Sequence, residues 1–164
     1  MIASGHNAIG TTVGLVVATY TNDPIPAFLA AVSFGLVFHY LADFVPHGHI
    51  ISNKEFGNLP PLLFLDLFGS FLIFYSFTLL KFGFSHTSLI VLIAIGASLL
   101  PDVVEGLLYF KKIPKIGIIR WENSMHQYLF HWHGHHEKAL MWAITRDSWQ
   151  ISIVILSLLF LILT

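Results

Sequence analysis

The feature that most restricts the fold of this chain is a series of long apolar runs separated by short polar segments. A helix of about 20 apolar residues spans the roughly 30 Å hydrocarbon core of a bilayer. Runs that approach or reach this length cover residues 5–20, 26–45, 60–80, 86–110 and 148–164. The sequence therefore predicts an all-α fold, a polytopic bundle of about five transmembrane helices that forms a single transmembrane domain over residues 1–164.

The balance of residue types favours the same prediction, because 55% of the residues are hydrophobic and only 10% are charged. Soluble domains carry about 25% charged residues, and a soluble fold of this size has too little interior to bury so many apolar side chains. The formal net charge is −1 and no basic stripe is present, so we expect no nucleic-acid partner. The chain has no cysteine, which excludes disulfides, thiolate metal ligands and a cysteine nucleophile.

Basic residues between the fourth and fifth runs orient the predicted bundle. Segment 111–146 is polar, aromatic and histidine-rich, and it carries most of the cations of the chain: Lys111, Lys112, Lys115, Arg120, Lys138 and Arg146. Positively charged loops remain in the cytoplasm. The sequence therefore predicts a multi-pass protein of the plasma (inner) membrane, with this interfacial segment, the N-terminus and the loop at 46–59 on the cytoplasmic side.

Most of the ten histidines and several acidic residues fall at one end of the predicted helices. Because each successive span reverses the direction of the chain, these imidazoles and carboxylates all fall on the predicted cytoplasmic side of the membrane. They are His6, His39, Asp43, His47, Asp66, Asp102, Glu105, His126, His131 and His135. His39 and Asp43 are four residues apart, so they share one helix face. Asp102 and Glu105 are three apart and also share a face. Reversing the whole protein across the bilayer leaves these groups together.

A divalent metal ion would explain this gathering of groups. Carboxylates at membrane depth are costly without a partner; a cation removes their mutual repulsion, and neutral imidazoles complete its ligand set. We therefore predict a metal site, with zinc preferred and iron or manganese as alternatives, that draws on His6, His39, Asp43, His47, Asp102, His126, His131 and His135. The predicted catalytic carboxylates, any of which can take the proton of a metal-bound water, are Asp102, Glu105 and Asp66.

Simpler interpretations of the same residues stay open. His39 and Asp43 can form a hydrogen-bonded pair between helices without a metal, and Asp66 can serve helix packing alone. The run from His131 to His136 can be a solvated interfacial segment, with Trp121 and neighbouring tryptophans in the aromatic belt of the membrane.

Several short motifs resemble those of one known family. They are His6-Asn7-Ala8-Ile9-Gly10, His39-Tyr40-Leu41-Ala42-Asp43 followed by Pro46-His47, Ser85-His86-Thr87-Ser88, and Leu100-Pro101-Asp102 continuing to Gly106. Together they are similar to the bacterial membrane-bound metal-dependent hydrolase family, whose Pro-Asp-x-Asp reads Pro101-Asp102-Val103-Val104 here. The resemblance implies a hydrolase in which a metal-activated water cleaves an ester, amide or phosphoester bond of a membrane lipid or another amphiphile that enters from the bilayer.

Other functions are compatible with parts of the sequence. His131, His135 and His136 form an H-x3-H-H box similar to those of membrane di-iron hydroxylases and desaturases, which carry several such boxes. Pro46-His47-Gly48-His49 resembles a fragment of membrane lipid phosphatases, but only Arg120 and Arg146 are available to bind phosphate. The remaining alternatives are a non-enzymatic metal- or proton-binding membrane protein and a membrane scaffold with a partner-binding loop. A homo-oligomer is compatible with each of these functions.

Overall fold

The computed structural model describes residues 3–44, 65–109, 117–125 and 140–163. Within these ranges the chain is helical apart from two short turns, and no strand occurs. The elements are α1 (Ala3–Tyr20), α2 (Pro24–Phe44), the π-helical turn η1 (Leu65–Gly69), α4 (Ser70–Phe82), α5 (His86–Tyr109), α6 (Gly117–Met125) and α7 (Leu140–Leu163). The all-α prediction is therefore confirmed for the described residues.

The helices follow the predicted apolar runs closely, with one difference at the last run. Runs 5–20, 26–45 and 86–110 correspond to α1, α2 and α5, and run 60–80 is described from Leu65 onward as η1 and α4. However, α7 begins at Leu140, well before the run at 148–164. Hydropathy marks only the apolar part of a helix, whereas the backbone ladder also continues through polar residues and good helix formers such as Leu, Met and Ala.

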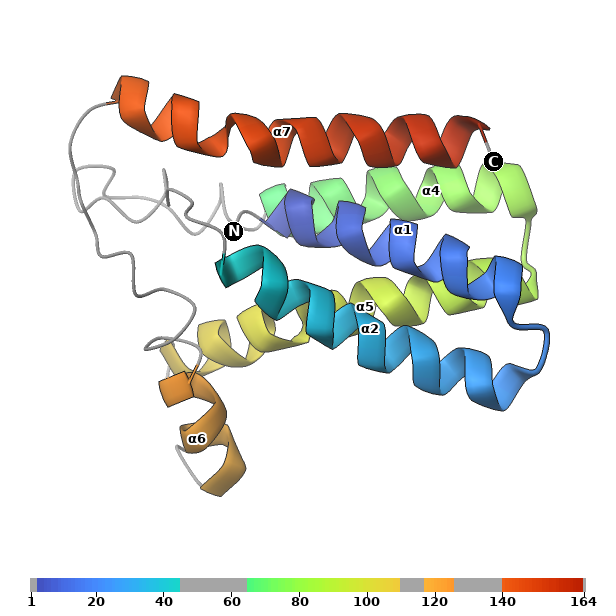
Figure 1. Cartoon of the computed structure of the whole chain (residues 1–164), viewed down its shortest axis with the longest axis horizontal. Helices are drawn as coiled ribbons and strands as arrows, with labels where there is room; N and C mark the ends of the chain where they lie inside the picture. Colours follow the sequence, from blue (N-terminus) through green and yellow to red (C-terminus); the bar gives the residue numbers. More distant parts are fainter. Residues whose placement is uncertain (1–2, 45–64, 110–116, 126–139, 164) are drawn as a thin grey trace.

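The turns at one end of the bundle show why the helices start and stop there. Pro24 stands at the first position of α2, where a missing N–H costs nothing, and Asp23 Oδ1 accepts the backbone N–H two residues further on at 3.1 Å. Helix α4 ends before Gly83, whose φ of 62° is a left-handed conformation that favours glycine. Ser85 Oγ accepts the Ser88 N–H at 3.3 Å at the start of α5. These turns produce two helical hairpins, α1–α2 and α4–α5 (Figure 1).

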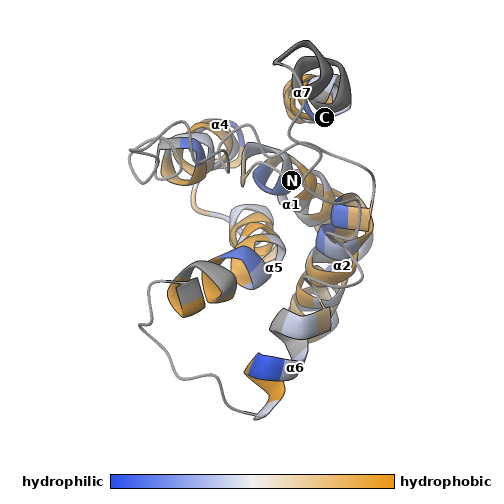
Figure 2. Ribbon diagram, turned by 90° about the vertical axis from the view of Figure 1, so that its left-hand side faces the viewer, coloured by the Kyte–Doolittle hydropathy of each residue, from blue (hydrophilic) through white to orange (hydrophobic). Residues whose placement is uncertain are grey.

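Helix α1 packs against α5, α2, α7 and α4, and α5 in turn packs against α2 and α4. The end-on view shows α4, α1 and α2 in an arc around α5 (Figure 2). A Cβ on Gly10 would lie 2.6 Å from Ile95 Cα, and one on Gly35 would lie 2.8 Å from the carbonyl oxygen of Ala94. Small residues let helix backbones approach this closely, so α1 and α2 are both held tightly against α5.

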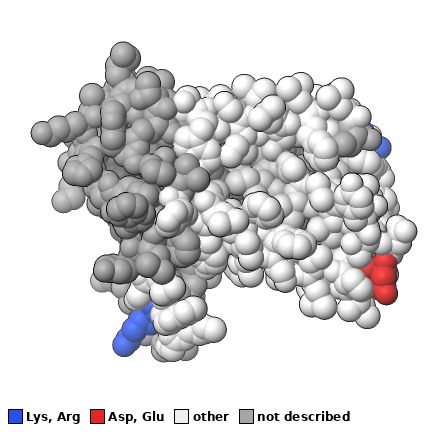
Figure 3. All heavy atoms as spheres, viewed as in Figure 1, with Lys and Arg blue, Asp and Glu red and all other residues white. Residues whose placement is uncertain are grey.

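Two helices are long and apolar enough to cross a membrane, on length and composition alone: α2 over Pro24–Phe44 and α5 over His86–Val104. A shorter apolar stretch covers Ser148–Leu163 in α7. Large apolar side chains also face outward, and on α2 they are Ile25, Phe28, Leu29, Phe34, Val37, Phe38, Leu41 and Phe44. On the face seen in Figure 3, the described acidic and basic side chains lie near the two ends of the bundle. The described residues thus hold two candidate spans, fewer than the five predicted from the sequence.

Candidate metal centre

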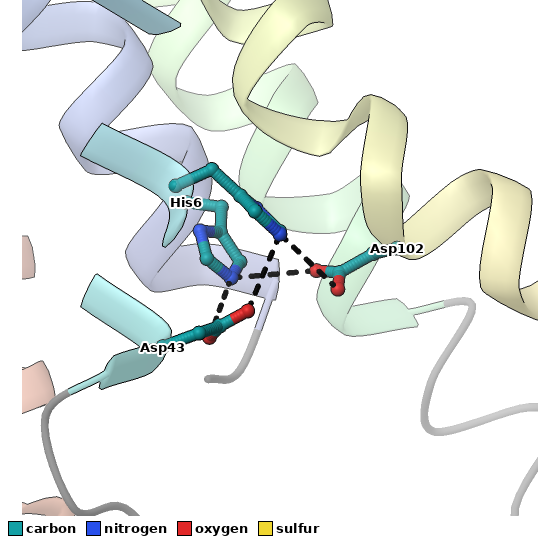
Figure 4. A group of neighbouring side chains, drawn as sticks. His6, Asp43 and Asp102 are labelled. Carbon is teal, nitrogen blue, oxygen red and sulfur yellow. Dashed lines mark ion pairs between the residues drawn. The ribbon is translucent and has the colours of Figure 1, made fainter. Parts of the chain in front are cut away.

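Four ionisable side chains from three helices meet at one end of the bundle. His6 comes from the start of α1, and Asp102 comes from α5 directly after Pro101. His39 and Asp43 come from the last turns of α2. Figure 4 shows His6, Asp43 and Asp102 pointing toward one another. One potential ligand atom from each of the four residues lies within 4.8 Å of the others, so this group could hold a metal ion.

Each of the two imidazoles faces both carboxylates. His6 Nε2 lies 3.3 Å from one oxygen of Asp43 and 3.4 Å from one oxygen of Asp102. His39 Nε2 lies 3.2 Å from the other Asp43 oxygen and 4.0 Å from the other Asp102 oxygen. Two nitrogen donors and the oxygens of two carboxylates therefore surround a common point, which is an arrangement suited to one cation.

The centre is almost closed to solvent. The side chains of His6, His39 and Asp43 are 0% exposed, and that of Asp102 is 27% exposed. Two carboxylates in such surroundings are costly unless positive charge accompanies them. Because Asp102 is the partly exposed member, the accessible side of the centre is the side of Asp102.

A backbone contact fixes the proton on His39. Its Nδ1 lies 2.7 Å from the carbonyl oxygen of Ser98, and a carbonyl oxygen can only accept, so Nδ1 carries a proton. In the neutral ring, Nε2 then presents its lone pair to the carboxylates of Asp43 and Asp102. Lone pairs that face each other repel, so either a cation or an added proton has to lie between the imidazole and the carboxylates.

The second imidazole lies directly beside the first. The rings of His6 and His39 are stacked, with centroids 4.1 Å apart and planes 28° apart. A proton added to each ring would place two like charges at this separation, and the carboxylates of Asp43 and Asp102 would have to offset both. Neither ring nitrogen of His6 makes a hydrogen bond with the part of the chain that the structure describes. One divalent ion bound by both rings avoids the two imidazolium charges.

Ser98 contacts both histidines of the cluster, although the spacing of histidines and carboxylates in the sequence does not predict this role. Its carbonyl oxygen accepts from His39, and its hydroxyl donates to the backbone carbonyl oxygen of His6 at 3.0 Å. Ligating histidines commonly hold such a contact through their other ring nitrogen. Ser98 is buried and lies four residues before Asp102 on the same face of α5. A small polar residue one turn from a predicted ligand is the signal that would have found it.

The other predicted site residues lie elsewhere or outside the described residues. Asp66 is in η1, and its carboxylate accepts backbone N–H groups at the start of α1 instead of joining the four clustered side chains. Glu105 lies in helix α5, but the structure does not describe its side chain. Four predicted ligands also fall outside the described residues: His47, His126, His131 and His135. The roles assigned to these residues stay predictions.

Comparison with known proteins adds no family to these observations. No known protein family, curated protein or solved structure matches the chain. The resemblance of its short motifs to the metal-dependent hydrolases therefore stays a prediction.

Proposed function

We propose that this protein is a membrane-embedded metal-dependent hydrolase whose metal centre is formed by His6, His39, Asp43 and Asp102. The observation that carries the proposal is the position of the His39 ring: Nδ1 donates to a backbone carbonyl, and Nε2 faces two carboxylates inside the bundle. A divalent cation compensates both carboxylates at once and uses the lone pairs of both imidazoles.

The donor set indicates the class of metal. Imidazole nitrogens with carboxylate oxygens suit zinc, and they also suit iron(II) and manganese(II). Catalytic zinc sites keep three protein ligands and one position for water. The three fully buried residues fit the ligand role, and Asp102 lies at the accessible side, where the water and substrate approach. We assign zinc, with Asp102 as a fourth ligand or as the group that takes the proton of the water.

A hydrolytic reaction follows from this assignment. His6, His39 and Asp43 would hold the divalent cation, whose chemistry would be to supply a water of lowered pKa as the nucleophile. Asp102 would accept the proton if it is not a ligand, and the substrate would reach the centre from the Asp102 side because the other three side chains are fully buried. The reaction class is hydrolysis of an ester, amide or phosphoester, in which water supplies the hydroxyl to the acid part and a proton to the alcohol or amine that leaves. The short motifs that resemble the metal-dependent hydrolases support the same class.

The proposed setting is a bilayer crossed by about five helices. Helices α2 and α5 supply the two candidate spans, and α1, α4 and α7 run beside them (Figure 1). The outward apolar side chains of α2 and the uncharged middle of the surface in Figure 3 support this setting. The basic residues of segment 111–146 favour a cytoplasmic location for the end that holds the centre. A lipid or another amphiphile would reach it from the membrane.

Elemental analysis of the purified protein tests the metal centre. We expect near-stoichiometric zinc in the wild type and its loss in His39→Ala and Asp43→Asn. The matched control is His86→Ala, because His86 starts α5 at the opposite end of the same helix that carries Asp102. The control should retain the metal. A wild-type protein that binds no divalent metal, even after reconstitution, would refute the centre.

Hydrolysis of a panel of ester, amide and phosphoester lipids then tests the enzyme class. We expect turnover by zinc-loaded wild type, loss on chelation, and a decrease of about 10²-fold or more in Asp102→Asn if Asp102 is the general base. Full metal occupancy without hydrolysis of any lipid would favour the second candidate, a non-enzymatic metal-binding membrane protein. The complete burial of three of the four side chains is the observation in favour of that candidate.

A further inference from the structure

The start of α1 is tied to the turn that precedes α4. The carboxylate of Asp66 in η1 accepts the Ala3 N–H at 2.7 Å and the Ser4 N–H at 3.3 Å. The first N–H groups of a helix have no partner within the helix itself. Asp66 therefore caps α1 from a part of the chain more than 60 residues away.

A second tie joins the same two segments immediately after His6. Asn7 is fully buried, and its side-chain amide donates to the carbonyl oxygen of Leu67 in η1 at 3.2 Å and to the hydroxyl of Ser70. The Ser70 hydroxyl donates in turn to the backbone carbonyl oxygen of Asp66. His6 thus lies between two anchored points, the capped start of α1 and the Asn7 side chain. Both anchors are on η1, and π-helical turns are frequent at functional sites.

The charge of Asp66 matters as well as its hydrogen bonds. The N-terminus of a helix carries the equivalent of about half a positive charge. His6 is about one turn from the start of α1, since each residue adds about 1.5 Å along the axis. A divalent cation at His6 Nε2 is repelled by that helix end, and the carboxylate placed on the end offsets the repulsion.

We propose that Asp66 is a positioning residue of the metal centre, which fixes the place of His6 through α1 and neutralises the positive end of that helix. The inference rests on the metal-binding function proposed above. Asp66 raises the affinity for the cation without touching it. The role differs from the catalytic role predicted for this carboxylate from the sequence.

Three substitutions separate the charge of Asp66 from its hydrogen bonds. Asp66→Asn keeps the size and one of the two acceptor oxygens but removes the charge, Asp66→Ala removes the charge and both acceptors, and Asp66→Glu keeps the charge and both acceptors. The matched control is Thr12→Val, which breaks the 2.9 Å hydrogen bond from Thr12 to Ser157 that joins α1 to α7. The control weakens the packing of the same helix, α1, at a position distant from the metal centre.

Zinc affinity by chelator competition, the electronic spectrum of the cobalt(II)-loaded protein and the thermal midpoint of the metal-free protein are measured in detergent. We expect Asp66→Asn and Asp66→Ala to bind zinc about tenfold or more weakly than wild type. Asp66→Ala should also change the cobalt spectrum, and Asp66→Glu should recover most of the affinity. Thr12→Val should lower the midpoint but keep the zinc affinity within about twofold of wild type.

One result overturns the inference alone. If the Asn and Ala variants at Asp66 lower only the thermal midpoint, with wild-type zinc affinity and cobalt spectrum, Asp66 is simply a helix cap. If Asp66→Ala does not fold, the result for Asp66→Asn alone decides the test, because Asn preserves the shape of the side chain. A different result, a wild type that binds neither zinc nor cobalt, overturns the proposed function and the inference with it.

Discussion

The two ends of the helix bundle use polar side chains differently. At the end with the α1–α2 and α4–α5 turns, three polar side chains bind backbone groups of the helix ends and turns. Asp23 accepts from the first turn of α2, and Ser88 donates to the Gly83 carbonyl oxygen. Lys81 Nζ donates to the last carbonyl oxygens of α7 at 2.7 and 2.8 Å. At the other end, four ionisable side chains face one another: His6, His39, Asp43 and Asp102.

This difference distinguishes polar groups that complete the hydrogen bonding of helix ends from a group of side chains that could hold a metal ion. A helix end offers N–H and C=O groups without partners in the helix, so a capping side chain completes the hydrogen bonding and requires nothing more. In the cluster, carboxylate oxygens face imidazole lone pairs under low exposure. The metal ion proposed above would complete that arrangement.

The largest effect is expected when the cation is removed from the clustered end. Zinc at about 100 times its Kd adds about 2.7 kcal/mol to the free energy of unfolding. Chelation should therefore lower the thermal midpoint of wild type by several degrees, as measured by circular dichroism in detergent. The midpoint of Asp43→Asn should not respond to zinc or chelator. A wild-type midpoint that is also indifferent to zinc would remove the contrast between the two ends.

The next effect concerns the close approach of α1 to α5. A Cβ on Gly10 would lie 2.6 Å from Ile95 Cα, so Gly10→Ala must separate the two helices. We expect a loss of about 1–3 kcal/mol of unfolding free energy and weaker zinc binding, because His6 is one turn away. Gly96→Ala is the control, since its Cβ would meet no atom within 4 Å. It should be neutral or stabilising by up to about 1 kcal/mol. Equal stability of the two variants would contradict the close packing.

A smaller effect is expected at the opposite end. Lys81→Met removes the ammonium that binds the last carbonyl oxygens of α7. The free energy of unfolding should fall by about 1 kcal/mol, and the zinc affinity should stay at the wild-type value. Thermal unfolding and chelator competition measure the two quantities. A loss of zinc affinity comparable with that of Asp43→Asn would show that the two ends are coupled.

The smallest effect distinguishes two buried serines. Ser98→Ala removes the hydroxyl that donates to His6 but keeps the carbonyl oxygen that accepts from His39. Ser88→Ala removes a comparable hydroxyl-to-carbonyl bond at the other end. Each should cost about 1 kcal/mol of unfolding free energy, but only Ser98→Ala should weaken zinc binding, by less than about tenfold. Equal zinc affinities for the two variants would leave Ser98 with a purely structural role.

The meeting of the four clustered residues could be predicted because apolar runs give both the length and the direction of each helix. His6 begins one run, and His39 and Asp43 end the next, so the three share one end of the bundle. Asp102 lies near the end of the fourth run and returns to the same end. Depth along a helix is therefore readable from the sequence alone.

The sequence does not give the rotation of each helix about its axis or the hydrogen-bond partners of its polar side chains. Asp66 lies at the expected end, but depth does not reveal that the nearest unpartnered groups are the N–H groups at the start of α1. Ser98 was missed because its contacts depend on which face of α5 meets α1 and α2. The early start of α7 at Leu140 was missed because helix formation continues beyond the apolar run.

If the cluster holds the proposed metal ion, its origin in three separate helices imposes an order on maturation. Synthesis delivers His6 first and Asp102 last, with most of two hairpins between them. No ion can be held fully until α1, α2 and α5 have docked. Metal binding would therefore follow the docking of the three helices. A shortage of zinc would leave folded chains that lack the stabilisation that the bound ion provides.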